Sequence, residues 1–322
     1  MDAIAAPILE TPLGLVVAAV LGALWGSFYN VCIARIPRGE SVVRPGSHCG
    51  ACNKPVRGYD NIPIVSYLLL RGRCRDCGAH FSARYALIEV LGAATSLLLF
   101  WKLAVLAPED PPAVRLARFA VGFAFTGVLT VLSFIDLATK RLPDVITLPS
   151  IPIFFLAGFA TPDVPWLERL IGAAAGYLVV RIIADGYYYL TGREGLGLGD
   201  GKLLAVIGAL LGWRALPPII FAASFVGVLV SIPILLIQRR REERAAAAGA
   251  GSDATAQPTA PPAEAPAEPP SGEADTPVVP TIRRTEVPFG PFLSLSAYVY
   301  LLAGPEIQAA LMTWLVGGPF PE

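Results

Sequence analysis

Two aspartates at the edges of apolar runs are the first side chains in this sequence with the means to do chemistry. Asp136 lies in Ser133–Asp144 and Asp200 in Gly195–Lys202. A charge at the centre of a membrane helix costs about 2.5–3.5 kcal/mol on insertion scales, so such residues are usually functional or paired. Two carboxylates within a few ångström cannot both ionise easily, so one keeps a proton near neutral pH. Such a pair can hydrolyse a peptide bond, because one carboxylate activates water while the other protonates the carbonyl oxygen.

The glycines before Asp200 favour this chemistry without proving it. Gly197 and Gly199 give the stretch Gly-Leu-Gly-Asp, in which the backbone is free to adopt unusual angles and to let another segment approach the carboxylate. A helix-end aspartate can also cap its helix or extend toward the membrane surface. The residues by themselves therefore leave both a catalytic and a structural interpretation open.

Four of the five cysteines form a second candidate site. Cys49 and Cys52 make one C-x-x-C pair, Cys74 and Cys77 make another, and 21 residues separate the two pairs. This spacing is typical of a tetrahedral four-thiolate zinc site of the ribbon type. Four thiolates leave no open coordination position, so the zinc is expected to be structural. We expect turns at Gly50 and Gly78, whereas His48 and His80 are interpreted as surface residues and Cys32 as part of a helix.

The elements that carry these residues are predicted to be membrane helices. Of 322 residues, 54% are hydrophobic and 16% are charged, and the mean hydropathy is +0.59. The apolar residues gather in runs long enough to cross a hydrocarbon core about 30 Å thick. The sequence predicts an all-α polytopic membrane protein with about eight transmembrane helices and a small cytoplasmic zinc-ribbon-like loop. The expected spans are 13–34, 85–106, 115–135, 146–160, 167–190, 201–213, 216–237 and 290–316.

The fourth and sixth of these spans are short, and Pro149 and Pro152 are expected to interrupt the fourth. The first follows acidic residues rather than a basic region and has no convincing cleavage site. It is therefore interpreted as a retained helix and not as a removed signal.

Basic residues set the expected orientation. The segment 35–84 holds nine Lys and Arg residues against three acidic ones, which places it in the cytoplasm by the positive-inside rule. Counting spans from there puts Asp136, Asp144 and Asp200 at cytoplasmic helix ends. With zero formal net charge, the composition gives no support for nucleic acid as a partner.

The same patterns divide the chain into five parts. We expect a first transmembrane helix at 1–36, a cysteine-rich zinc-binding loop at 37–84 and a transmembrane peptidase core at 85–244. A cytoplasmic linker is expected at 245–280, and a last transmembrane helix with the C-terminus at 281–322. The linker segment has no aromatic residue, Leu or Ile, so it cannot bury enough surface to offset the entropy of ordering.

Several stretches together resemble one family. They are Gly26–Pro37, Asn61–Tyr67, Arg84-Tyr85 with Glu89, Asp136 with Leu142-Pro143-Asp144, Gly197–Leu204, and Pro288–Phe292. The combination is similar to the prepilin peptidases, bifunctional leader peptidases and N-methyltransferases of type IV pili and type II secretion. These belong to the G-x-G-D membrane aspartyl proteases. The resemblance covers nearly the whole chain except 245–280, which looks like an insertion. Gly201 also departs from the pattern, since a larger residue often stands there.

The resemblance implies roles for particular residues. The family's catalytic aspartates match Asp136 and Asp200, whereas Asp144 matches a neighbouring aspartate interpreted as structural. The cysteine-rich loop belongs to the part linked with methyl transfer, and a glycine associated with methylation matches Gly72. S-adenosylmethionine is the implied methyl donor.

The expected function is therefore a bacterial inner-membrane enzyme with its active site on the cytoplasmic side. It would cleave the basic leader of prepilins or pseudopilins, whose apolar helix lies in the lipid, and then methylate the new N-terminus. A proton- or cation-coupled transporter using Asp136 and Asp200 as a relay is the alternative from another class. A zinc-ribbon scaffold without catalysis is a third possibility.

Overall fold

The computed structural model describes residue 9 and residues 11–192, 197–250 and 288–316. Within these ranges the protein is all-α, as predicted, and β-structure is limited to two isolated bridges, His48–Pro55 and Arg73–His80. The chain divides into two compact units. The first comprises Met1–Phe225 with Pro288–Glu322, and the second is Val226–Val287.

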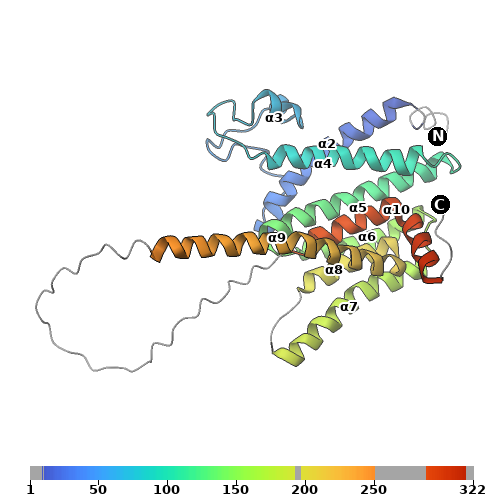
Figure 1. The fold of residues 1–322 in the computed structure, drawn as a ribbon. Helices are drawn as coiled ribbons and strands as arrows, with labels where there is room; N and C mark the ends of the chain where they lie inside the picture. Colours follow the sequence, from blue (N-terminus) through green and yellow to red (C-terminus); the bar gives the residue numbers. More distant parts are fainter. Residues whose placement is uncertain (1–8, 10, 193–196, 251–287, 317–322) are drawn as a thin grey trace, which may run out of the picture. The chain divides into compact units, whose positions relative to one another are not determined.

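Each of the eight predicted spans coincides with a helical segment, the last of which, α10, is kinked at Ala303 (Figure 1). The long helices are α2 (Pro12–Arg35), α4 (Arg84–Phe100), α5 (Pro112–Thr139), α6 (Asp144–Ala157), α7 (Trp166–Thr191), α8 (Leu198–Leu211), α9 (Leu216–Ala250) and α10 (Gly290–Val316). Shorter elements join them: η1 (Ile36–Arg38), η2 (Gly58–Asn61), α3 (Val65–Leu69), the π-helical η3 (Trp101–Val105), η4 (Gly158–Ala160) and η5 (Trp213–Ala215).

Four of these segments are long and apolar enough to cross a membrane by length and composition: Pro12–Arg38, Arg84–Val105, Pro112–Thr139 and Trp213–Ile237. The region Asp144–Ala160 is apolar but shorter. The 14 residues of α8 reach only about 21 Å at 1.5 Å per residue. The prediction that Pro149 and Pro152 interrupt the fourth span is wrong, because α6 runs through both prolines without a break. Membrane helices tolerate proline where neighbouring groups and local adjustments satisfy the freed backbone.

Glycines let two pairs of helices pack with their backbones close together. In the α2–α4 pair, a Cβ atom on Gly22 would clash with the carbonyl oxygen of Gly92. In the α7–α8 pair, a Cβ atom on Gly176 would lie 2.5 Å from the carbonyl oxygen of Leu204, and one on Gly208 would clash with Gly172. Small residues at such spacing are the usual means of close helix packing in lipid.

Helix α8 lies at the centre of the main core. Gly201 and the run Leu203–Leu210 are buried, and they share a hydrophobic cluster with residues of α5 and α10. Phe125, Leu132 and Leu293 are fully buried members of this cluster. The short helix is therefore enclosed by other helices rather than exposed to lipid, and its first turn holds Asp200 in a fixed place.

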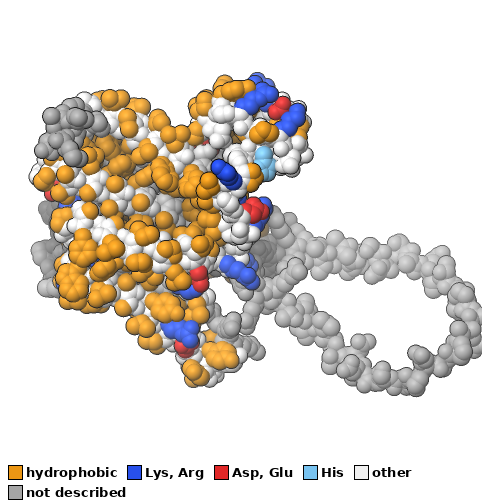
Figure 2. All heavy atoms as spheres, turned by 180° about the vertical axis from the view of Figure 1, so that it is seen from behind, with side chains coloured by type: hydrophobic (Ala, Val, Ile, Leu, Met, Phe, Trp, Pro, Cys, Tyr) orange, Lys and Arg blue, Asp and Glu red, His pale blue; other side chains and the backbone are white. Residues whose placement is uncertain are grey.

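Outside this core, the helices present hydrophobic side chains to their surroundings. Leu13, Val16, Val20 and Leu24 follow one exposed face of α2. Figure 2 shows hydrophobic side chains over most of the helical face that it draws. Soluble proteins rarely expose so much contiguous apolar surface to water, so these faces are those of a membrane protein. Helix α9 continues to Ala250, past the expected start of the linker, and residues 251–287 lie outside the described residues.

Candidate active site and metal site

Asp136 occupies the last turn of α5 and is buried, with 6% of its surface exposed. The helix ends at Thr139, and the next residue, Lys140, has a left-handed backbone with φ 54° and donates its N–H to the carbonyl oxygen of Asp136 over 2.8 Å. This hydrogen bond closes the last turn of α5 and so fixes the position of Asp136 relative to the connection that leads to α6.

Asp200 lies in the first turn of α8, and its backbone N–H donates to the carbonyl oxygen of Gly197 over 3.2 Å. Its carboxyl group is half-buried and within the range of electrostatic interaction with Asp136. The structure thus places the two predicted aspartates, which belong to helices far apart in the sequence, near enough to interact electrostatically. The beginning of the glycine motif, Gly195-Leu196, lies outside the described residues.

Gly290 is a third member of this site that the sequence did not identify as one. Its backbone N–H, at the first residue of α10, donates to Oδ2 of Asp136 over 3.0 Å. A Cβ atom on Gly290 would lie 2.7 Å from the same oxygen, so only glycine leaves room for this contact. Gly290 lies in the stretch Pro288–Phe292, which resembles the family, but the sequence of this stretch does not show that it contacts Asp136.

Asp144 does not join the two aspartates. It lies in the first turn of α6 with 57% of its side chain exposed, and Oδ1 accepts a hydrogen bond from Nζ of Lys202 at 2.5 Å. Beside it, a Cβ atom on Gly199 would lie 3.2 Å from Cβ of Leu142. Gly201 is equally confined, because its Cβ would approach Cβ of Val180 in α7 to 3.1 Å. The small residue at 201 therefore fits the close packing of α7 on α8.

The four predicted metal ligands form a compact cluster. The sulfur atoms of Cys49, Cys52, Cys74 and Cys77 all lie within 4.8 Å of one another, and those of Cys49 and Cys77 are 3.8 Å apart. Tetrahedral zinc with Zn–S bonds of about 2.3 Å places its sulfurs about 3.8 Å apart. The donor set and spacing thus fit a metal such as zinc. Cys32 lies apart in α2, and His48 and His80 are exposed and outside the cluster.

The two cysteine pairs sit in equivalent knuckles. The N–H of Cys49 donates to Lys54 and that of Cys74 to Ala79, at 2.9 and 2.8 Å. Gly78 takes the left-handed conformation expected of it, with φ 72°, but in the first knuckle Asn53 rather than Gly50 does so, with φ 57°. Asparagine tolerates this region better than most residues. Backbone N–H groups of Cys52 and Ala51 lower the pKa of the Cys49 thiol to about 6.

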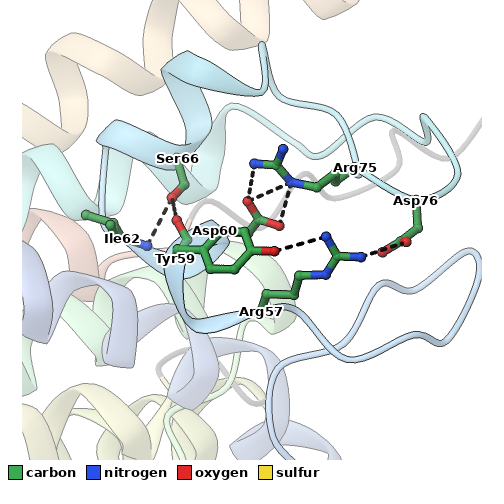
Figure 3. Close-up of polar contacts among 7 residues, drawn as sticks. All are labelled: Arg57, Tyr59, Asp60, Ile62, Ser66, Arg75 and Asp76. Carbon is green, nitrogen blue, oxygen red and sulfur yellow. Dashed lines mark hydrogen bonds and ion pairs between the residues drawn. The ribbon is translucent and has the colours of Figure 1, made fainter.

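Polar contacts connect the segment between the knuckles to the second knuckle (Figure 3). Arg75 makes a bidentate ion pair with Asp60, with its shortest contact at 2.6 Å, and lowers the pKa of that carboxyl group. Arg57 contacts the Tyr59 hydroxyl at 3.0 Å and Asp76 at 3.5 Å. The loop therefore has a defined structure even though its hydrophobic core is small.

The ribbon, residues 37–84, is attached to the membrane helices through a carboxylate. Oε2 of Glu89 in α4 accepts a hydrogen bond from the N–H of Ile64 over 2.7 Å. Ile64 has φ 64° and ψ −51°, and Val65 donates to Pro63 across it over 2.6 Å, which defines a rare classic γ-turn. Nδ2 of Asn30 also donates to the carbonyl oxygen of Tyr85 over 3.0 Å, which joins α2 to the start of α4.

Gly72 has a conformational reason to be glycine. Its φ is 65°, and a Cβ atom there would lie 2.9 Å from the hydroxyl oxygen of Tyr67. Its carbonyl oxygen accepts from Phe81 over 2.7 Å, which closes the base of the second knuckle.

Comparison with known proteins gives two family matches in this order along the chain. Residues 20–103 match the bacterial peptidase A24 N-terminal domain, and residues 123–232 match the type IV leader peptidase family. The second match includes both aspartates, and the first includes all four clustered cysteines.

Individual relatives are similar over most of their length. A prepilin leader peptidase/N-methyltransferase of Myxococcus xanthus is 35% identical over 95% of this chain and 96% of its own. One from Aeromonas salmonicida is 34% identical over 88% of each chain. Another from Neisseria gonorrhoeae is 37% identical over 71% of this chain and 85% of its own. No solved structure matches.

Proposed function

This chain belongs to the type IV leader peptidase family, and we propose on that basis how its two aspartates carry out the reaction. The protein is a prepilin peptidase that also has N-methyltransferase activity. It removes the leader peptide of type IV prepilins or type II secretion pseudopilins and methylates the N-terminus that cleavage exposes. The observation that carries the proposal is the electrostatic interaction between Asp136 of α5 and Asp200 of α8.

Peptide cleavage uses the two aspartates as a pair that shares one proton. The ionised carboxylate takes a proton from water as the water oxygen attacks the scissile carbonyl carbon. The protonated carboxyl group gives its proton to the carbonyl oxygen, which forms a tetrahedral intermediate. When the C–N bond breaks, the leaving nitrogen receives a proton and the pair returns to its starting state. The N–H of Gly290 fixes one oxygen of Asp136 during this cycle.

The substrate reaches the pair at the membrane surface. A prepilin has a basic leader followed by an apolar helix, so it can lie in lipid beside the enzyme and present its cleavage site at the level of the helix ends. Nine Lys and Arg residues in 35–84 support a cytoplasmic ribbon and, with it, a cytoplasmic active site in the bacterial inner membrane.

Zinc held by the four thiolates is proposed to be structural. The complete sulfur shell leaves no place for water, and metal binding stabilises a loop that cannot build much core of its own. We also propose the division of the chain into five parts, at residues 1–36, 37–84, 85–244, 245–280 and 281–322.

S-adenosylmethionine is the proposed methyl donor, and it supplies an electrophilic methyl group to the new amine. The described residues present no arrangement that we can assign as its binding site, so we derive no step through it. Gly72 is proposed to contribute to methyl transfer by holding the turn under Tyr67.

The transporter alternative is not supported. The relatives are named as peptidases and methyltransferases, and the two aspartates lie within the range of electrostatic interaction, whereas a relay requires groups spread across the membrane thickness.

Cleavage of a candidate prepilin in membranes, with and without S-adenosylmethionine, tests the proposal. We expect mass spectrometry to show loss of the leader in both cases and one added methyl group only with the donor. An intact prepilin after incubation with active, inserted protein would overturn it.

Labelling of single cysteines from each side of the membrane tests the orientation. On a background without native thiols, cysteines at positions 139 and 193 should label from the cytoplasm, and one at 163 from outside. Outside labelling at 193 would refute the proposed topology and would also separate Asp200 from the side that Asp136 faces.

A further inference from the structure

An ion pair joins two segments that lie within eight residues of the aspartates along the chain. Nζ of Lys202 is 2.5 Å from Oδ1 of Asp144. Lys202 follows Asp200 by two residues near the start of α8. Asp144 is the first residue of α6, and the short connection before it begins after Thr139, three residues beyond Asp136. Each partner is thus tied by a few residues of chain to one of the two aspartates.

A second contact joins the same two segments. Gly199 packs against Leu142 so closely that its Cβ atom would lie 3.2 Å from the Leu142 side chain. The first turn of α8 is therefore held to the α5–α6 connection at two points, one apolar and one ionic. Both contacts lie near the N-terminal end of α8, where Asp200 is located.

The helix ends explain why the charges are arranged in this way. Asp144 at the start of α6 interacts favourably with the positive end of that helix. Lys202 stands near the positive end of α8, where a cation is disfavoured unless an anion is near it. Because only 22% of the Lys202 side chain is exposed, salt screens the pair less than it screens a surface pair. The Asp144 carboxylate therefore stabilises the Lys202 ammonium group in this position.

We propose that Asp144 and Lys202 form a positioning pair that holds Asp200 at the separation from Asp136 that peptide cleavage requires. The proposal rests on the function proposed above. In this role the two residues act through Asp200 and not through contact with the substrate, so their loss should affect the rate of the chemical step and not prepilin binding. A misplacement of about 1 Å at a reacting group can cost about 100-fold in rate.

The test is a double-mutant cycle in the full-length protein in membranes. Lys202→Gln and Asp144→Asn should each lower kcat for prepilin cleavage by about 10- to 100-fold and leave KM unchanged. The double variant should lose no more than either single one, because the same interaction is removed. Lys202→Arg should restore most of the rate, since it keeps the charge.

The Lys102–Glu306 pair provides a matched control. Its distance is 2.9 Å and its side-chain exposures are 35% and 59%, close to the 22% and 57% of the Lys202–Asp144 pair, but it joins η3 to the far part of α10. Lys102→Gln should leave kcat and KM unchanged. Methylation of a pre-cut peptide should also stay at the wild-type rate in every variant.

Two results would overturn the proposal. A rise in KM with unchanged kcat in Asp144→Asn would mean that this carboxylate binds the basic leader directly. Wild-type kinetics in Lys202→Gln would mean that the pair does not position Asp200. Failure of the underlying function is a different result: the wild type would then leave prepilin intact, or Asp136→Asn would still cleave it.

Discussion

The cysteine cluster and the aspartate pair are built on opposite principles. The cluster comes from two equivalent knuckles within one loop, and Cys49 and Cys77 are 28 residues apart. The aspartate pair needs α5, α8 and the start of α10, and its contact between Asp136 and Gly290 spans 154 residues. Local hydrogen bonds shape the first site, whereas helix packing shapes the second. The metal site should therefore respond to changes within its loop, and the peptidase site to changes on any of three helices.

The largest effect is expected from the aspartates themselves. Asp136→Asn or Asp200→Asn should lower prepilin cleavage by about 10,000-fold or more, as the loss of one member of a catalytic unit does in other proteases. Metal content and methylation of a pre-cut peptide should remain at wild-type levels, because the cluster does not depend on the pair. Near-normal processing by either variant would show that the pair is not catalytic.

Gly290→Ala should have the next largest effect. The added Cβ would stand 2.7 Å from Oδ2 of Asp136 and push the carboxylate aside, so cleavage should fall about 10- to 100-fold. Gly186→Ala is the matched control, since nothing lies within 4 Å of the position its Cβ would take. Equal cleavage rates in the two variants would contradict the place we assign to the start of α10.

Loss of a cysteine ligand should have the opposite pattern of effects from loss of an aspartate. Cys77→Ser should reduce the metal content from about one ion per chain, the ratio for a four-coordinate structural site. Methylation should fall with it, whereas cleavage should change little. Cys32→Ser should keep the metal, because Cys32 is buried in α2 away from the cluster. Equal metal content in the wild type and in a variant lacking all four ligands would refute the assignment.

The smallest effect is expected from Asp60→Asn. Arg75 lowers the pKa of Asp60, so the pair stabilises the ribbon above the ordinary carboxyl pKa of about 3.9 and ceases to do so as pH falls through the lowered value. Hydrogen exchange in residues 57–76 should be slightly faster in the variant at pH 7. The difference should begin to shrink below about pH 4 and vanish once the pH is below the lowered pKa of Asp60, and a constant difference at all pH values would exclude the ion pair as its cause.

The two sites also differ in how far the sequence predicted them. The cysteine spacing identified all four thiols of the cluster because a knuckle is a local structure. Only the turn residue was misplaced, since Asn53 takes the role expected of Gly50. Asp136 and Asp200 could be paired through family resemblance, but no spacing connects them to each other or to Gly290. The contact of Lys202 with Asp144 was likewise hidden, because packing of α8 on the α5–α6 connection creates it.

The helices show the same limit. Hydrophobic runs located all eight, but hydropathy alone did not reveal that α8 is enclosed by its neighbours. The prolines of α6 suggested a break that packing in an apolar setting does not require.

The hydrogen bond from Gly290 also has a consequence for the order of events during synthesis. Ribosomes add roughly 5–20 residues per second, so the 154 residues from Asp136 to Gly290 take roughly 8 to 30 s to make. When that interval begins the nascent chain already has all four cysteines and Asp136, and it gains Asp200 partway through, but Asp136 has no partner from α10 until the interval ends. The metal ribbon can mature early, and the peptidase site is completed only when the last helix arrives.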